Sequence, residues 1–301
     1  MILVFGTVCL DRVHCVPSYP RPGGYAEISK EVSLLGGEAA NTALALAHWS
    51  VVPTVFGNGP GIGPDSETLR KLIAGAGFDL IVAEDGDLTP VCDIYVTPNG
   101  DRTMFGRGFS TIKQGVDVTK APYQAGSWFT VDSNMEEIAR EAANLARDRG
   151  MNVYLMDFIR DTDKITKGSW WQSSTDSVGH RSNTQKNVAW VKEFVAKSGC
   201  FAILSDGPNG FVAGSQEVPV RAFPPYPCPE VVDTTGAGDV FRAGMLFGLS
   251  QSWLISDCLR FASAAGCLNC RGLGATSKLP TVAEIKALIQ DNPDVSRGYD
   301  L

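Results

Sequence analysis

The sequence predicts an α/β protein in which a mostly parallel central sheet is covered by helices on both faces. Short apolar runs, typical of buried strands, alternate with segments that have the length and apolar spacing of helices. This alternation is typical of βαβ units, whose crossover helices cover a parallel sheet. A chain of 301 residues with 44% apolar content also suffices for a substantial core, in one large domain or two ordinary ones.

The first expected strand is the apolar run Ile2 to Phe5, which ends at Gly6 and is followed by Asp11. A dinucleotide-binding Rossmann protein needs G-x-G-x-x-G at this place, and only Gly6 is present. The commonest oxidoreductase fold is therefore excluded.

Two segments, 12–35 and 91–110, contain prolines, paired glycines and short alternating stretches that favour small exposed strands over helices. The second segment has a turn at 98–101 between two strand-like runs. We therefore expect the two segments to form one small sheet. Arg102 and Arg107, after the turn, are candidates for contacting an anionic or polyhydroxylated ligand, although most arginines are solvated surface residues.

Between these segments, Gly36 and Gly37 precede an alanine- and leucine-rich helix expected over 39–48, which carries Asn41. Paired glycines before a helix expose backbone amides to a polar ligand, or they serve only close packing of the helix start. The expected strand 54–56 leads into a glycine-rich loop, 57–65, which we interpret as a connector. It has neither G-x-G-x-x-G nor the G-x-x-x-x-G-K-[ST] of a P-loop.

After a helix expected over 66–76, strands and helices alternate regularly. The expected elements are strands over 127–131, 153–156 and 201–204, helices over 136–149 and 188–197, and a hairpin-like run over 211–220. Polar residues follow apolar runs at Asp132, Asp157, Ser205 and Asp233. Ligands bind at the carboxyl ends of parallel strands, so these residues indicate the edge where a site is expected.

The stretch 231–250 has the most specific pattern in the chain. An apolar run is followed by Asp-Thr-Thr, then by Gly236-Ala237-Gly238, and then by a helix that begins at Asp239. Glycines beside a helix N-terminus leave amides free for an anion. A carboxylate there would repel a bound phosphate but suits a general base, so Asp239 is predicted to take a hydroxyl proton while the amides stabilise a transferring phosphoryl group. A capped helix with no catalytic role is the alternative.

The run D-T-T-G-A-G-D at 233–239, with Phe241 and Gly244, resembles the C-terminal motif of the ribokinase-like carbohydrate kinases, the PfkB family. Gly36-Gly37 with Asn41 resembles the N-terminal motif of the same family. The resemblance implies a three-layer α/β/α sandwich with a small β lid. In that arrangement residues 1–11, 36–90 and 111–301 form the nucleotide-binding and catalytic core, and 12–35 and 91–110 form the lid.

The resemblance also implies site residues. Substrate ligands are expected at Asp11, Gly36, Gly37, Asn41, Arg107 and Asp132. ATP-binding residues are expected at Arg160, Asp176, Ser205, Gly207, Gly210, Thr235 and Ser263. A K⁺ site is expected at Asp233, Thr235, Asn269, Gly272 and Gly274. Ribokinase has lysine where this chain has Glu38 and asparagine where Ser263 falls, and the family's N-x-x-E is absent from the region 169–187, where Asp176 alone supplies a carboxylate.

The hypothesis is an ATP- and Mg²⁺-dependent kinase that phosphorylates a hydroxyl of a sugar or sugar-like molecule. A nucleoside kinase of the same fold and a catalytically silent sugar- or nucleotide-binding regulator are the alternatives. The net charge of −7 argues against nucleic-acid and anionic-membrane partners. The absence of a basic leader and of an apolar run near roughly twenty residues favours a cytoplasmic protein. A homodimer through the lid edges is a further expectation, and the eight scattered cysteines are expected as thiols.

Overall fold

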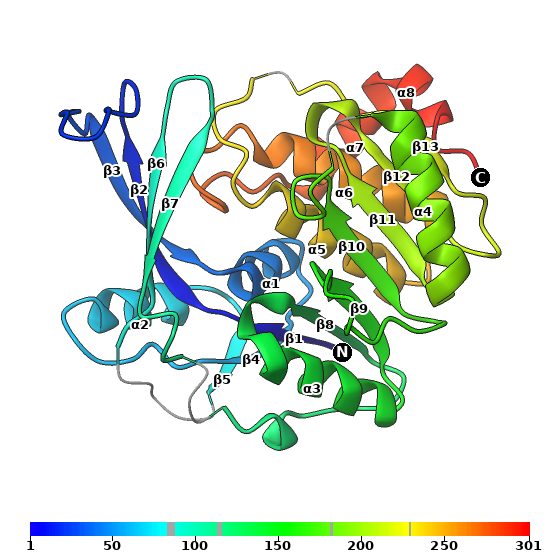
Figure 1. The fold of residues 1–301 in the computed structure, drawn as a ribbon, viewed down its shortest axis with the longest axis horizontal. Helices are drawn as coiled ribbons and strands as arrows, with labels where there is room; N and C mark the ends of the chain where they lie inside the picture. The colour runs from blue at the N-terminus through cyan, green and yellow to red at the C-terminus, as the bar shows by residue number, and fades with distance from the viewer. Residues whose placement is uncertain (83–87, 113–115, 181–182, 229) are drawn as a thin grey trace.

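The structure, a computed structural model, describes residues 1–82, 88–112, 116–180, 183–228 and 230–301. Residues 83–87, 113–115, 181–182 and 229, which fall within the expected core ranges, lie outside the described residues. The chain forms a large sheet with helices on both faces and a second, smaller sheet beside it (Figure 1).

The large sheet has nine strands in the order β13-β12-β11-β10-β9-β8-β1-β4-β5. Its strands are β1 (Ile2–Gly6), β4 (Thr54–Gly57), β5 (Asp79–Val82), β8 (Trp128–Asp132), β9 (Asn152–Met156), β10 (Trp170–Ser174), β11 (Phe201–Ser205), β12 (Phe211–Gly214) and β13 (Arg221–Phe223). All neighbours from β5 to β11 pair parallel, and only β12 and β13 are antiparallel. The mostly parallel sheet predicted from the sequence is confirmed.

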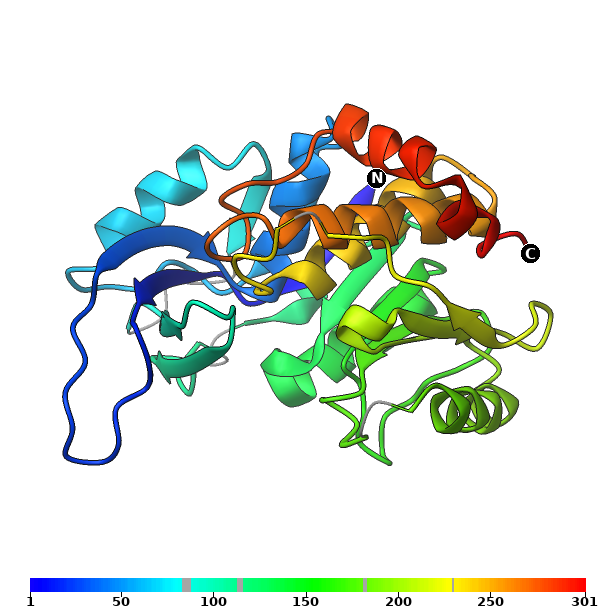
Figure 2. The same ribbon diagram turned by 90° about the horizontal axis from the view of Figure 1, so that it is seen from above.

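Alternate side chains of the large sheet's strands point to opposite faces and pack into two separate hydrophobic cores. On β1, Ile2 and Val4 pack on one face and Leu3 and Phe5 on the other, and all four are at most 2% exposed. The first core also contains residues of α1, α5, α6 and α7, while α3 and α4 cover the second face (Figure 2). The helices are α1 (Glu38–His48), α2 (Ser66–Ala74), α3 (Glu136–Asp148), α4 (Thr184–Ser198), α5 (Ala237–Ser250), α6 (Ile255–Asn269), α7 (Val282–Asp291) and α8 (Pro293–Arg297). Within the described residues, none of these is long and apolar enough to cross a membrane.

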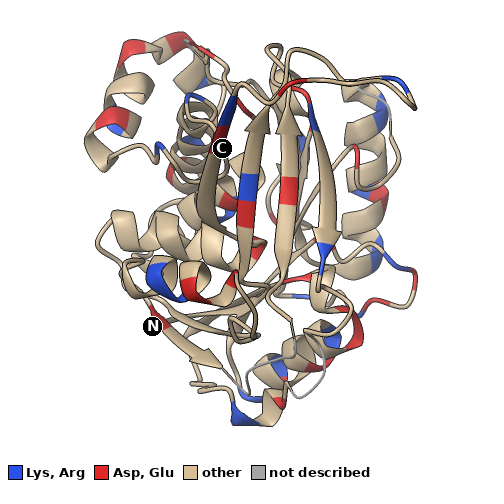
Figure 3. Cartoon of the chain, turned by 90° about the vertical axis from the view of Figure 1, so that its left-hand side faces the viewer, with Lys and Arg blue, Asp and Glu red and all other residues tan. Residues whose placement is uncertain are grey.

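The small sheet has four strands in the order β3-β2-β6-β7. They are β2 (Cys9–Cys15), β3 (Lys30–Gly36), β6 (Val91–Val96) and β7 (Arg102–Arg107). The two sequence segments predicted to pair therefore do so, but the sheet begins at Cys9 rather than at residue 12. The proline-rich residues 16–29 form no strand, because proline lacks the N–H that a ladder requires. Figure 3 faces this sheet and shows that its strands carry residues of both charges.

Side chains of the small sheet bind the large domain at two places. Arg12 and Arg107 both form ion pairs with Asp65, and the bond from Arg107 Nη2 to Asp65 Oδ2 is 2.7 Å. Arg102 Nη1 donates to Thr234 Oγ1 at 2.8 Å. The loop 57–65 is thus more than a connector, because the carboxylate at its end fixes the orientation of the small sheet.

Candidate active site

The turn before α5 depends on Gly236. Its φ of 74° lies in the left-handed region, and a Cβ there would lie 2.7 Å from the carbonyl oxygen of Ala275, so only glycine fits. α5 begins at Ala237, and the amides of a first helical turn have no intrahelical acceptor. The N–H of Ala237 donates to Thr234 O at 3.3 Å, which leaves Gly236 and Gly238 as the more favourable donors for an anion.

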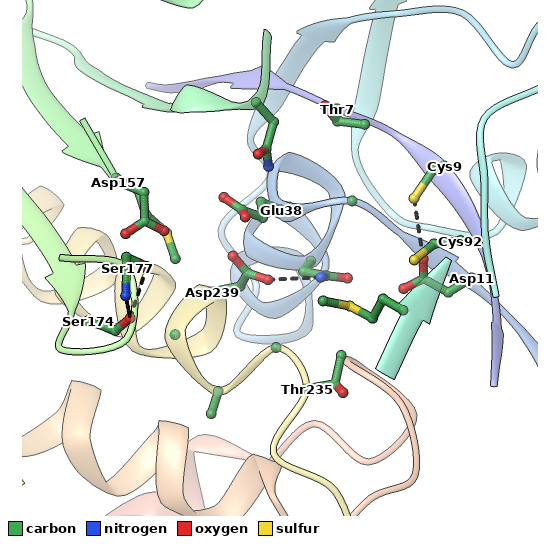
Figure 4. Close-up of a pocket in the computed structure, with 18 of the residues that line it drawn as sticks. Thr7, Cys9, Asp11, Glu38, Cys92, Asp157, Ser174, Ser177, Thr235 and Asp239 are labelled. Atoms are coloured by element: carbon green, nitrogen blue, oxygen red, sulfur yellow. Dashed lines mark hydrogen bonds between the residues drawn. The ribbon is translucent and has the colours of Figure 1, made fainter. Parts of the chain in front are cut away.

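This turn opens into a cavity of about 960 Å³ between the large and small sheets. Residues from both ends of the chain line it (Figure 4). The predicted site residues among them are Asp11, Gly37, Asn41, Asp176, Ser205, Gly207, Thr235, Gly236, Ala237, Gly238 and Asp239. The structure therefore gathers most of the predicted catalytic, substrate-binding and ATP-binding residues around one space.

Asp239 lies on the first turn of α5 and is 5% exposed. Asn41 Nδ2 donates to its Oδ2 at 2.8 Å, and Arg242 Nη2 lies 3.4 Å from its Oδ1. Burial, followed by the charge of Glu38, raises the pKa of Asp239 to about 7, although Arg242 and Asn41 act in the opposite direction. A carboxyl with a pKa near neutrality can both accept and release a proton at physiological pH.

Asp11 and Gly37 also line the cavity, and Gly36 packs against Asp11. A Cβ on Gly36 would lie 2.1 Å from the Asp11 carboxyl carbon, so Gly36 provides the space that this carboxyl occupies. Gly37 has φ 94°, and a Cβ there would lie 2.2 Å from Thr7 O. Cys9 Sγ donates to Asp11 Oδ1 at 3.3 Å, and burial raises the pKa of Asp11 to about 7. Glycine at positions 36 and 37 thus allows the backbone to approach Asp11 and Thr7 closely, and it also leaves room for a ligand.

Glu38, the residue after the glycine pair, also lines the cavity and was not predicted as a ligand. Burial and the charge of Asp132 raise its pKa to about 8. Asp132 itself is fully buried at the end of β8, its Oδ1 accepts from Asn134 N at 3.1 Å, and burial raises its pKa to about 6. The substitution of glutamate at a position where the resembled kinase has lysine was the signal in the sequence.

Gln172 on β10 also lines the cavity and is hydrogen-bonded to the first turn of α5. Its Nε2 donates to Gly238 O at 2.9 Å, and its Oε1 accepts from Tyr154. Asp157, which also lines the cavity, accepts from Ser173 Oγ and has a left-handed φ of 56°. Strained backbone of this kind is concentrated at functional sites. Asp157 and Asp176 both contribute carboxylate oxygens to the lining of the cavity.

Several predicted ligands point away from the cavity. Arg107 is paired with Asp65, and Arg160 Nη1 donates to Glu137 on the surface at 2.6 Å. Ser263 Oγ accepts from Tyr299 in the core. Glycine at position 210 is explained by close packing, because a Cβ there would lie 2.1 Å from Phe223 O. In this arrangement none of the four faces the space where Asp239 lies.

A sequence profile described as pfkB family carbohydrate kinase matches residues 1–282. The chain belongs to the PfkB family of carbohydrate kinases. It is 32% identical to an "Uncharacterized sugar kinase" of Dictyostelium discoideum, over 97% of this chain and 98% of the relative. Its fold is similar to that of a ribokinase from Thermotoga maritima (TM-score 0.75, 18% identity, 96% of this chain and 99% of the other). It is also similar to a Cryptococcus neoformans ribokinase in complex with ADP (TM-score 0.75, 19% identity, 95% and 98%).

The K⁺ ligands implied by the family resemblance lie together but are occupied by hydrogen bonds. Asp233 Oδ1 accepts from the N–H and hydroxyl of Thr235, and its Oδ2 accepts from Gly274 N at 2.8 Å. Asn269 Nδ2 donates to the carbonyl oxygens of Thr235 (3.3 Å) and Ala275 (2.9 Å). A side-chain amide thus supplies donors to the carbonyls that a cation would bind, although Asn269 Oδ1 has no hydrogen-bond partner among the described residues. The side chains of Asp233, Thr235 and Asn269 as arranged do not form a K⁺ site.

Other predicted features of this PfkB-family chain are resolved by the structure. All eight cysteines are free, as expected. Cys267 and Cys270 are therefore thiols at the C-terminal end of α6 and form no disulfide. In the described part of the chain, no group of three or more His, Cys, Asp or Glu side chains has the arrangement of a metal site.

We expect the mutation Glu38→Gln to change how stability depends on pH. The pKa of Glu38 is about 8 in the folded state, against an ordinary value of 4.5, so the folded state retains a proton that the unfolded state loses. Stability conferred by the neutral form is fully present near pH 4.5 and is lost as pH rises through about 8. By pH 8 the variant should gain at least ~1 kcal/mol relative to wild type, compared with pH 5.

Thermal melts of both proteins between pH 5 and 8 test this expectation. Glu193→Gln is the matched control, because Glu193 is exposed and forms an ion pair with Lys197 on α4. A difference in Tm between wild type and Glu38→Gln that stays constant over this range would contradict it.

Proposed function

We propose that this PfkB-family kinase transfers the terminal phosphoryl group of ATP to a hydroxyl of a sugar or sugar-like acceptor, with Asp239 as the general base. The observation that carries the proposal is that Asp239 and the turn Gly236–Gly238 line one cavity with Asp11 and Asn41. A base and an anion-binding turn in the same enclosed space are what in-line transfer to an alcohol requires.

In this mechanism Asp239 accepts the proton of the acceptor hydroxyl. Its raised pKa, about 7, makes the carboxylate a better proton acceptor than an exposed aspartate. The amides of Gly236 and Gly238 and the positive end of α5 stabilise the charge on the transferring group. Asn41 holds Asp239 through the 2.8 Å hydrogen bond and thereby orients the carboxylate toward the cavity.

The nucleotide would lie along the wall formed by Asp176, Ser205 and Gly207. Asp157 and Asp176 would hold Mg²⁺ together with the phosphates, since Mg²⁺ commonly uses one or two carboxylates and keeps several waters. Bound Mg²⁺ would neutralise phosphate charge during transfer. The small sheet is proposed as the lid, because Met104 and Arg102 of β7 line the cavity and Arg102 reaches Thr234 beside the anion-binding turn.

A coupled ADP-release assay with a panel of sugars, sugar acids and nucleosides tests the proposal. ADP release that depends on one of the sugars supports it, and release with nucleosides alone would favour a nucleoside kinase. Ligand binding without a phosphorylated product from any acceptor would favour a silent regulator. The presence of Asp239 argues against that alternative, because a pure phosphate binder binds more tightly without this charge.

We expect turnover to be nearly independent of K⁺. The amide group of Asn269 already donates to the carbonyls of Thr235 and Ala275, and both oxygens of Asp233 accept hydrogen bonds. Replacing K⁺ with Na⁺ or choline at constant ionic strength should change kcat by less than about twofold, since no cation ligand is then removed. A fall of tenfold or more in the absence of K⁺ would show that these side chains rearrange around the ion.

A further inference from the structure

Three buried acceptor oxygens around the substrate end of the cavity have no hydrogen-bond partner among the described residues. They are Glu38 Oε2, Asn41 Oδ1 and Asp132 Oδ2. Glu38 and Asn41 line the cavity, and Asn41 is only 5% exposed. Figure 4 shows Glu38 and Asp239 around the same space. Buried polar atoms are nearly always paired, so a ligand that supplies several donors is indicated.

The charges around this space have the same sign. Burial and the charge of Asp132 both raise the pKa of Glu38. Burial and the charge of Glu38 both raise the pKa of Asp239. The balancing cation is Arg242, which is fully buried. Its Nη2 donates to Glu38 O, its Nε donates to Thr42 Oγ1, and it also contacts Asp239. Nη1 of Arg242 has no hydrogen-bond partner among the described residues, and this one guanidinium does not fully compensate the carboxylates. Burial and the neighbouring carboxylates therefore raise the pKa values of Glu38 and Asp239, and this environment favours binding of a positive group.

We propose that the acceptor of this kinase carries an ammonium group, as an amino sugar does, and that Glu38 and Asn41 recognise it. Asp132, which is fully buried and does not line the cavity, adds negative charge near Glu38. An ammonium group offers three donors and no acceptor. It matches the unpartnered oxygens of Glu38 and Asn41, because an ionised carboxylate and an amide oxygen only accept hydrogen bonds. A neutral hydroxyl offers one donor and leaves the carboxylate charge uncompensated in a buried site. This inference rests on the proposed function, and it names the class of its substrate.

The ammonium group is a recognition element and takes no part in the transfer. It is protonated, so it has no lone pair with which to attack phosphorus. The reacting group remains a hydroxyl, whose proton passes to Asp239 as its oxygen bonds to the phosphoryl group and the bond to ADP breaks. Compensation of the carboxylates by the ligand also reduces their repulsion of the incoming phosphates.

The test compares glucosamine, galactosamine, mannosamine and 1-amino-1-deoxyfructose with glucose, galactose, mannose and fructose. Calorimetry measures binding without turnover, and ADP release measures kcat/KM. At least one ammonium sugar should bind and react tenfold or more better than its hydroxyl counterpart. In Glu38→Gln that ratio should fall to within about threefold, because a neutral amide cannot compensate a cation. The control Glu193→Gln, on the outer face of α4, should keep the wild-type ratio.

Proton release provides a second readout that a purely structural role of Glu38 would not produce. Binding of a cation favours the ionised form of Glu38, whose pKa is raised to about 8, so the protein should release a proton at pH 7. Titrations in two buffers of different ionisation enthalpy measure this release. It should be much smaller with the neutral sugars and in Glu38→Gln.

Failure of the inference and failure of the proposed function give different results. The inference is overturned if no ammonium sugar of the panel binds, if the neutral sugars bind as tightly, or if Glu38→Gln keeps the preference. The proposed function is overturned if an ammonium sugar binds with the expected preference and proton release but yields no phosphorylated product. Wild-type turnover of an ammonium sugar by Asp239→Asn would reject the general base alone.

Discussion

Replacement of Asp239 with asparagine is expected to lower kcat by roughly 10²–10⁴-fold, because loss of a positioned general base has an effect of this size. Asparagine preserves the shape of the side chain and can still bond to Asn41 after reorientation. Arg242, which now lies 3.4 Å from Asp239 Oδ1, loses part of its compensation. The affinities for ATP and acceptor should therefore change much less than kcat, which initial rates and calorimetry can separate.

Asp148→Asn is the matched control, since Asp148 is an exposed residue at the end of α3 and should keep wild-type turnover. A further readout is the pH profile. The wild-type kcat/KM should rise with pH through about 7, as Asp239 ionises, and the variant should lack this limb. Turnover of Asp239→Asn within a few-fold of wild type would refute the general-base role.

Substitution of alanine for Gly236 is the second change for which a large effect is expected. The new Cβ would lie 2.7 Å from both Cβ and O of Ala275, and φ would remain at +74°, where L-residues are strained. The turn must shift, which moves the amides of Gly236 and Gly238 away from the transferring group. Misplaced oxyanion-type donors reduce kcat by roughly 10²-fold or more. Single-turnover kinetics with ATP in excess would measure the chemical step directly.

Gly126 provides a control with the same backbone and no steric clash. Its φ is +75°, and no atom lies within 4 Å of the position of its Cβ. Gly126→Ala should therefore cost about 1 kcal/mol of stability from backbone strain alone and leave kcat unchanged. Equal turnover of Gly236→Ala and Gly126→Ala would show that the close approach to Ala275 is unimportant for phosphoryl transfer.

The parts of the fold that burial alone dictates were predictable from the sequence. Strands β1, β4, β8, β9 and β11 are continuous apolar runs because helices cover both faces of the sheet. β10 was missed, since Gln172 and Ser173 are polar yet only 2% exposed. Their polar atoms are satisfied by Gly238, Tyr154 and Asp157, and no periodicity in the sequence reports such tertiary hydrogen bonds.

The candidate site was predictable where a residue acts through its own backbone or local motif. Gly236 to Asp239 and the pair Gly36-Gly37 fall into this group. Glu38 and Arg242 were missed as functional residues, because their roles come from side chains brought together by the packing of α1 on α5. Arg107 was predicted as a ligand on its chemistry, but Asp65, which binds it, lies 42 residues away in the chain.

The hydrogen bond between Asn41 and Asp239 joins positions 198 residues apart. During synthesis, α1 leaves the ribosome long before α5. The alanine-rich face of α1 therefore stays unpacked while the intervening strands are made. Contacts of such long sequence separation slow folding and leave apolar surface exposed for longer. The nascent chain therefore completes the surroundings of the Asp239 carboxylate only after α5 has been synthesised.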